Sequence, residues 1–168
     1  MKRKPKRKKR NLILLPAIVA VLCAAYLIFP SGTSTTVMKG HSMEPAIRDG
    51  QVLTIDLNYY NRNPIRRGDI IQYKLMSVSE PLIGRVIALP GDGVEINDGR
   101  IAINGTPLTG YNLTEGEARI ISKPLDAYGG VPPGSILVLT DNHASGADSG
   151  RFGFIPTEYV KGKALLNG

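Results

Sequence analysis

The feature that most constrains this chain is a block of basic residues followed at once by a long uncharged apolar run. Eight of the nine residues from Lys2 to Arg10 are Lys or Arg, and the apolar run extends over 18 residues from Leu12 to Phe29. As a helix rising about 1.5 Å per residue, this run would be about 27 Å long, close to the thickness of a bilayer's hydrocarbon core. The sequence therefore predicts a membrane-spanning helix near its N-terminus.

This helix divides the chain into three expected parts. Because basic residues precede the run and few follow it, the N-terminus should lie in the cytoplasm. We expect a basic cytoplasmic tail at 1–11, a transmembrane anchor at 12–30 and an extracytoplasmic domain at 31–168. A cleaved secretory signal has the same order of basic and apolar residues, but this run ends in the bulky residues 27–30, where cleavage requires small ones. Cys23 should pack inside the span as a small hydrophobic residue.

Charge and cysteine content exclude several classes of protein. The net charge is +7, but apart from the N-terminal block the chain has 13 basic and 14 acidic residues, so the expected outer domain is nearly neutral. The charge distribution therefore argues against a basic nucleic-acid-binding fold, for which only the N-terminal tail would speak. A single cysteine rules out an intramolecular disulfide framework. With two histidines and scattered carboxylates, we expect no metal ion and no organic cofactor.

Beyond residue 30 the pattern is that of β-strands. Short apolar runs alternate with turn residues, as in an antiparallel sheet, and no window of a dozen residues keeps a helical period. The expected strands are 52–57, 69–75, 82–89, 94–96, 100–103, 135–140 and 159–166. Asp98-Gly99 favours a tight hairpin between two of them. Between Thr106 and Pro133 we expect loops or a small β-insert. The predicted fold class is mostly β, with one N-terminal transmembrane helix.

Four motifs carry a family resemblance. They are Ser-Met-x-Pro at 42–45, Arg-Gly-Asp-Ile at 67–70, Arg-Val-Ile-x-Leu-Pro-Gly-Asp at 85–92, and Asp-Asn, Asp-Ser and Phe-Gly between 141 and 153. Their order and spacing, together with the N-terminal span, resemble type I signal peptidases, and Gly40 resembles the Gram-positive branch. The resemblance runs from the basic tail to about Val160 and implies the antiparallel β-sheet domain of that family.

The resemblance also implies a function and a site. The chain would be a membrane-bound serine endopeptidase that removes signal peptides from exported proteins. Ser42 would be the nucleophile, and its own backbone N–H would contribute to the oxyanion hole. The substrate would bind extended against exposed strands, with small side chains at its −1 and −3 positions. The expected substrate-binding residues are Met43, Pro45, Arg85 and Val86, and the expected supporting loop residues are Asp141, Asn142 and Asp148.

The sequence departs from the family at the general base. The family has a neutral lysine immediately before the Arg-Val motif, but here that position is Gly84. Gly146 stands where the family has a serine that orients this lysine. From these two departures we expect that Gly84→Lys, alone or with Gly146→Ser, increases activity. His143, with Asp141 or Asp148, is a candidate substitute base.

Two other residues near the serine are weaker candidates for the base. Lys39 precedes Ser42 by three residues. His41 adjoins the serine, but neighbouring side chains of an extended segment point to opposite faces.

Two functions therefore remain open from the sequence. One is signal-peptide cleavage by an unusual mechanism, although loss of a general base typically lowers the rate by about 10²–10⁴-fold. The other is a catalytically inactive homologue that binds secreted or pilus subunits, or works beside an active signal peptidase paralogue. In either case the expected partners are signal peptides and the lipid bilayer, and no nucleic acid.

Overall fold

The computed structural model describes residues 32–142 and 147–166. The expected cytoplasmic tail and transmembrane anchor, as well as His143 and Gly146, lie outside these residues. Within the described ranges, no helix is both long enough and apolar enough to cross a bilayer. A compact unit begins at Thr33 and contains all the strands described below.

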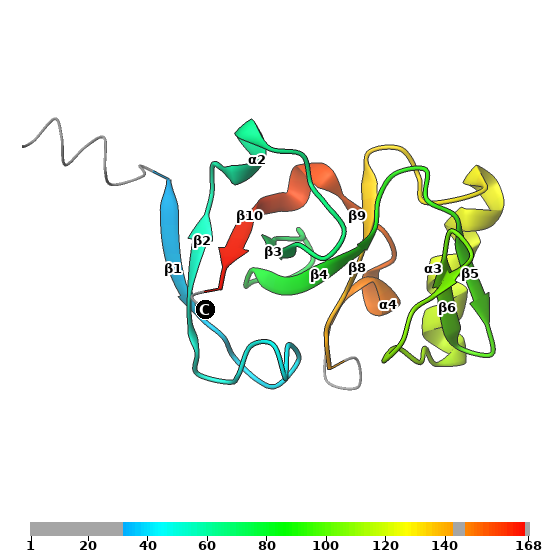
Figure 1. Cartoon of the computed structure of the whole chain (residues 1–168), viewed down its shortest axis with the longest axis horizontal. Helices are drawn as coiled ribbons and strands as arrows, with labels where there is room; N and C mark the ends of the chain where they lie inside the picture. Colours follow the sequence, from blue (N-terminus) through cyan, green and yellow to red (C-terminus); the bar gives the residue numbers. More distant parts are fainter. Residues whose placement is uncertain (1–31, 143–146, 167–168) are drawn as a thin grey trace, which may run out of the picture. The chain divides into compact units, whose positions relative to one another are not determined.

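The largest element is an antiparallel sheet of seven strands, ordered β1-β2-β10-β3-β4-β8-β9 (Figure 1). In chain order these strands are β1 (Thr33–Val37), β2 (Val52–Asp56), β3 (Ile70–Tyr73), β4 (Leu82–Ala88), β8 (Ser135–Leu139), β9 (Ile155–Pro156) and β10 (Val160–Leu165). The antiparallel β prediction is confirmed, and five of these strands lie within predicted runs. Strands β1 and β9 were not predicted.

A second, smaller sheet follows β4. It has three antiparallel strands, β5 (Val94–Asn97), β6 (Arg100–Ile103) and β7 (Thr106–Pro107). Strands β5 and β6 form the predicted hairpin, in which Asp98 and Gly99 have φ angles of 49° and 77°. Positive φ at both central residues is what a type I′ turn requires, and the Asp-Gly sequence tolerates it.

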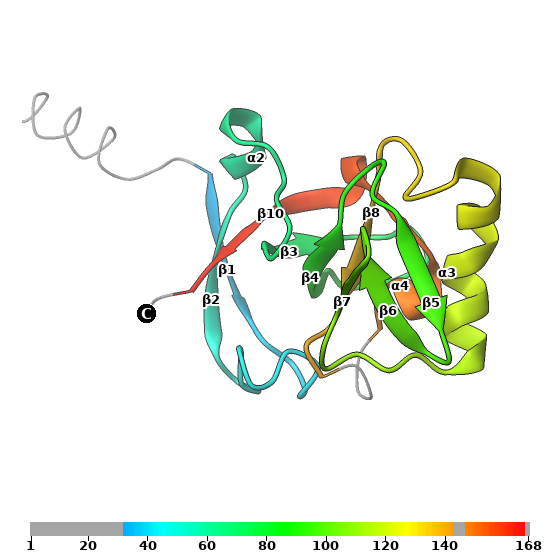
Figure 2. The same ribbon diagram turned by 45° about the vertical axis from the view of Figure 1, so that its right-hand side comes forward.

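Beside the small sheet lies a helix that the sequence pattern did not predict (Figure 2). Helix α3 (Glu115–Tyr128) has 14 residues, so the expectation of loops or a small β-insert between 106 and 133 is wrong for this stretch, although β7 at its start does belong to a small sheet. Its start is fixed by a capping box, because Thr114 accepts a bond from the Glu117 N–H while the Glu117 carboxylate accepts one from the Thr114 N–H. Gly129, with φ of 67°, ends it. Pro124 inside the helix weakens its periodic pattern.

Three short helical segments complete the described chain. They are α2 (Tyr59–Arg62), α4 (Ser149–Phe152) and the 3₁₀ turn η3 (Thr157–Tyr159). Helix α4 begins at Asp148, whose side chain accepts a hydrogen bond from the Gly150 N–H. This cap sets the position of the segment that follows the gap at 143–146.

The main sheet has a separate apolar cluster on each side of β4. Ile83 packs against the cluster that contains Met43, whereas Val86 belongs to the cluster that contains Tyr73 and Val138. Successive residues of a strand point to opposite faces, so Gly84 lies on the Val86 side and Ile83 on the other.

Candidate active site

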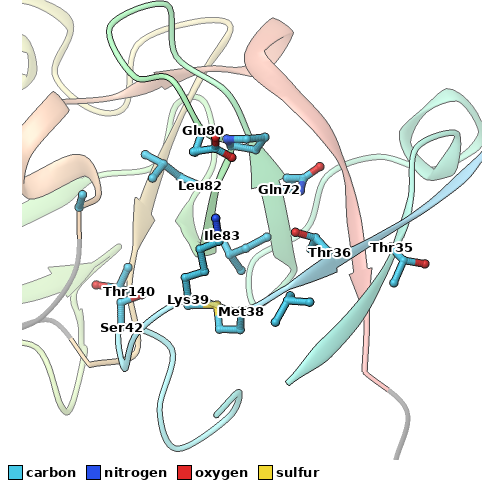
Figure 3. A pocket seen from close by; sticks show the side chains of 13 residues that line it. Thr35, Thr36, Met38, Lys39, Ser42, Gln72, Glu80, Leu82, Ile83 and Thr140 are labelled. Atoms are coloured by element: carbon cyan, nitrogen blue, oxygen red, sulfur yellow. The ribbon is translucent and has the colours of Figure 1, made fainter. Parts of the chain in front are cut away.

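Ser42 lies at a groove between β1 and the start of β4 (Figure 3). The groove has a volume of about 480 Å³. One wall is formed by residues 35–39, and the opposite wall consists of residues 80–83 together with Gln72. Thr140 and Ala147 also line it. We call this cavity the Ser42 groove.

Hydrogen bonds and a buried side chain hold the turn that carries Ser42. Gly40 has a φ angle of 81°, which a residue with a side chain rarely adopts, and its N–H donates to Asp49 Oδ1 at 2.7 Å. The Ile47 N–H donates to the Met43 carbonyl oxygen at 2.8 Å. The Met43 side chain is fully buried beneath the turn. Ser42 itself is half-buried, so the hydroxyl-bearing residue is held at the groove by its neighbours.

The loop after β8 lies against this turn. The Asn142 N–H donates to the Ser42 carbonyl oxygen at 2.8 Å. Asp148, which is 1% exposed, accepts hydrogen bonds from the Thr140 N–H at 2.8 Å, the Thr140 hydroxyl at 2.9 Å and the Gly150 N–H at 2.8 Å. Asp148 therefore ties together the two ends of the loop and fixes the segment that touches Ser42.

Asp141 holds the same loop to β4. Its carboxylate accepts a bidentate pair from Arg85, with Nε–Oδ1 at 2.7 Å and Nη2–Oδ2 at 2.6 Å. This hydrogen-bonded pairing raises the pKa of Arg85. The Tyr111 hydroxyl donates to Asp141 at 3.4 Å, and burial raises the pKa of Tyr111 to about 12. Arg85 does not line the Ser42 groove, so here it is a clamp on the loop rather than a contact for a peptide.

The space beside Gly84, the position at which the sequence resemblance leads us to expect a lysine, is occupied by neighbouring side chains. A Cβ atom built on Gly84 would lie 2.5 Å from Val138 Cγ1 and 3.5 Å from Tyr73 Cε1. Tyr73 is fully buried, its hydroxyl donates to the Ala147 carbonyl oxygen at 3.2 Å, and burial raises its pKa. Val138 is stiff because it is β-branched, so it cannot swing aside cheaply. The expectation that Gly84→Lys, alone or with Gly146→Ser, increases activity therefore needs correction, because Val138 must also change.

The other residues predicted for substrate binding do not line the Ser42 groove either. Met43 and Val86 are fully buried in the two apolar clusters on opposite sides of β4. Pro45 is exposed and lies outside the groove. Hydrophobic side chains next to motif residues were read as contacts for a peptide, whereas they pack the core that holds the motifs.

The structure describes one of the two histidines, His41. His41 is exposed, does not line the groove, and places Nδ1 2.9 Å from Glu44 Oε1, a contact that raises its pKa. His143 lies outside the described residues. Among those that are described, no group of three or more His, Cys, Asp or Glu side chains is placed to hold a metal ion.

Sequence reasoning missed most of the groove walls. Residues 35–38 and 80–83 face one another across it, although they are far apart in the chain. The run at 82–89 was predicted as a strand, but nothing in the sequence indicated that β1 lies opposite its start. The available signal was the sequence of β1, Thr-Ser-Thr-Thr-Val, which is rich in β-branched residues.

The known proteins that are similar to this chain are signal peptidases. The family described as "Signal peptidase, peptidase S26" matches residues 10–167. A signal peptidase I of Bacillus caldolyticus is 33% identical over 174 residues, which cover 96% of this chain and 91% of that protein. A signal peptidase I of Leptolyngbya laminosa is 36% identical over 136 residues, covering 74% of this chain but only 63% of that protein.

Two further matches come from Gram-positive bacteria. Signal peptidase IB of Staphylococcus aureus is 26% identical, with 89% of this chain and 86% of that protein covered. A crystal structure of a signal peptidase I from Enterococcus faecalis has 28% identity and a TM-score of 0.44, covering 60% of this chain and 97% of that chain. Because the S26 family matches nearly the whole sequence, this chain belongs to the type I signal peptidase family.

Proposed function

We propose that the protein is a membrane-anchored serine endopeptidase that removes signal peptides from exported proteins, with Ser42 as its nucleophile. The observation that carries the proposal is the position of Ser42 at a groove that lies between two stretches of chain. The bond from the Asn142 N–H to the Ser42 carbonyl oxygen holds the serine there. Family membership supplies the class of substrate.

The groove suits an extended peptide. Strand β1 is the first strand of the main sheet, so its outer edge can pair with a further strand. Val37 and Leu82 from the two walls give the groove apolar surface. We expect the residues just before the scissile bond to lie here with small side chains, while main-chain hydrogen bonds to β1 hold the peptide.

The chemistry proposed for Ser42 is acyl transfer. The Ser42 Oγ atom attacks the scissile carbonyl carbon, and the Ser42 backbone N–H donates to the oxyanion that forms. A serine hydroxyl attacks slowly unless a base takes its proton. Gly84 supplies no such base, so the base must come from elsewhere in the groove.

Location at the membrane is part of the same proposal. We infer a cytoplasmic tail at 1–11, an anchor at 12–30 and an extracytoplasmic domain beyond it, from the charge and hydropathy pattern. An anchored enzyme meets its substrate where the apolar part of a signal peptide crosses the bilayer. The anchor would therefore raise the local concentration of substrate at the Ser42 groove.

A second function is favoured by one specific observation. Val138 and Tyr73 fill the space beside Gly84, so a lysine in the family's place would not fit without rearrangement. A protein that binds signal peptides or pilus subunits without cutting them, or that assists an active paralogue, would need the groove but no base. In this alternative the protein binds the same class of peptide but does not cleave it.

One experiment separates the two functions. The full-length protein in detergent micelles is mixed with a labelled signal-peptide substrate that carries Ala at −1 and −3, and both binding and cleavage are measured. Endopeptidase function predicts cleavage after the −1 residue by the wild type, and binding without cleavage by Ser42→Ala. Binding without cleavage by the wild type would support the binding protein. Absence of binding would contradict both.

A further inference from the structure

We propose that Lys39 is the general base for Ser42 and replaces the lysine that the family carries at the position of Gly84. The inference rests on the proposed function, because a base is needed only if Ser42 reacts. It assigns the role of proton acceptor to the wall formed by residues 35–39, on the segment that leads from β1 into the turn that carries Ser42.

Placement is the first argument. Lys39 and Ser42 line the same groove, and the two residues are separated only by Gly40 and His41. In Figure 3 the Lys39 side chain extends into the groove, and its amino nitrogen lies over Ile83. A peptide bound along β1 would therefore lie against the Lys39 side chain.

Elimination is the second argument. Among the described residues that line the groove, only Lys39 and Glu80 have side chains that commonly exchange a proton. Figure 3 shows Glu80 at the end of the groove away from Ser42. A carboxylate with an ordinary pKa of about 4.3 is also a weak base for a serine hydroxyl, whereas a neutral amine is a strong one.

Availability is the third argument. Within residues 32–142 and 147–166, the Lys39 side chain makes no hydrogen bond and no ion pair. By contrast, Lys163 is held by Asp69 at 2.6 Å and by the Tyr59 ring at 4.6 Å. Because the Lys39 side chain is exposed and untethered, rotation about its own bonds can bring the amine toward Ser42 without breaking a contact.

Peptide binding would set the protonation state of Lys39. An exposed lysine is normally charged, and only its neutral form can accept a proton. A peptide in the groove excludes water from the amine, and loss of water favours its neutral form. Two acidic groups lie around this segment: Glu80 lines the same groove, and Asp49 accepts a bond from the Gly40 N–H. Both favour the ammonium form, so desolvation by the peptide must outweigh them.

The reaction then proceeds in balanced steps. The neutral Lys39 amine accepts the Ser42 hydroxyl proton as Oγ bonds to the scissile carbonyl carbon. When the tetrahedral intermediate collapses, the carbon–nitrogen bond breaks and the Lys39 ammonium gives its proton to the leaving amine. A water molecule next attacks the acyl ester while Lys39 accepts its proton. The ester bond breaks, and Ser42 Oγ takes this proton back.

The test uses the full-length protein, the Ala-containing substrate described above and variants of Lys39. Lys39→Ala is expected to lower kcat at least 100-fold with KM changed less than threefold. Lys39→Arg should be equally impaired, because a guanidinium stays protonated. Lys161→Ala removes an exposed lysine outside the groove and should leave the rate unchanged. Adding methylamine to Lys39→Ala should restore part of the rate, which loss of a purely structural side chain would not permit.

The pH profile gives an independent readout. The wild-type kcat should rise with pH as the Lys39 amine loses its proton, and the residual rate of Lys39→Ala should lack that rise. Cleavage that depends on Ser42 but survives in Lys39→Ala would overturn the role of Lys39 and leave the proposed function standing. If His143→Ala abolishes such cleavage, the base is His143 instead. Impairment of Lys39→Ala without rescue or a changed pH profile would also contradict the inference, and a wild type that binds but does not cut would overturn both proposals.

Discussion

The surroundings of Ser42 and of Gly84 differ in kind, although both residues lie beside the segment that runs from β8 into the following loop. Ser42 is held at an open groove by a backbone hydrogen bond from Asn142. Gly84 is buried, and Val138 and Tyr73 occupy the space that its side chain would need. Backbone contacts hold Ser42 at the groove, so its position does not depend on a side chain at residue 84.

Ile83 and Gly84 are neighbours in β4, but they point to opposite faces of the sheet. Ile83 faces the groove, whereas Gly84 faces the apolar cluster of Val138 on the other side of the sheet. Packing inside that cluster can tighten over a glycine without changing the groove wall. The side chain at residue 84 can therefore change without a change in the groove wall.

The largest expected effect concerns the loop shared by both regions. Asp148→Ala leaves the Thr140 N–H, the Thr140 hydroxyl and the Gly150 N–H without their buried acceptor. We expect the free energy of unfolding to fall by about 3–5 kcal/mol. Urea denaturation measures it, with Asp126→Ala, an exposed aspartate of α3, as the control expected to change little. A loss below about 1 kcal/mol would show that Asp148 does not hold the loop.

The next effect is on catalysis at residue 84. Gly84→Lys alone should not raise the cleavage rate, because its Cβ would meet Val138 Cγ1 at 2.5 Å. Gly84→Lys combined with Val138→Ala should exceed Gly84→Lys by about 100-fold, equivalent to about 2.7 kcal/mol of transition-state stabilisation. Initial rates on the same Ala-containing substrate measure this. Val138→Ala by itself serves as the control and should not be faster than the wild type.

A smaller effect is expected when an uncharged side chain is introduced at residue 84. Gly84→Ala should lower the free energy of unfolding by about 1–3 kcal/mol, because the added methyl group overpacks the cluster. Gly116→Ala is the matched control, since nothing lies within 4 Å of its added Cβ and the residue is in helix α3. That variant should be more stable by about 0.5–1 kcal/mol. Equal effects of the two substitutions would mean that the space beside Gly84 is not filled.

The smallest effect is a pH dependence outside both regions. Burial alone would raise the pKa of Asp92, but bonds from Arg67, the Leu89 N–H and Asn104 outweigh it and lower the pKa below its usual value of 3.8. Because the folded-state pKa is the lower one, this stabilisation is present above pH 3.8 and is lost as the pH falls through the folded-state value. Asp92→Asn should lose under about 1 kcal/mol at pH 7, and its unfolding free energy should fall less steeply below pH 4. An unchanged slope would contradict the pairing.

The strands were largely predictable because each depends on a local pattern. The alternation at 52–57 and 82–89 and the Asp98-Gly99 turn are readable within a few residues. Helix α3 was missed because Pro124 weakens its periodicity, although Thr114, Glu117 and Gly129 carried the capping signals. Local signals at the ends of an element were here more informative than the pattern along it.

The candidate site was predictable in its motifs and not in its walls. Ser42 and the loop at 141–148 were identified from the sequence, and the Asn142 bond brings them together. The overlap between Gly84 and Val138 depends on the pairing of β4 with β8, which no local pattern specifies. The same holds for the approach of β1 to residues 80–83, so the groove could be located only in the folded chain.

The most direct measurement is a double-mutant cycle on the packing beside Gly84. The free energies of unfolding of the wild type, Gly84→Ala, Val138→Ala and the double variant are determined by urea denaturation under one set of conditions. Since the added methyl group would occupy the space that Val138 vacates, the double variant should be more stable than the sum of the single effects by at least about 1 kcal/mol. Additive effects would contradict the conclusion that Val138 fills the space beside Gly84.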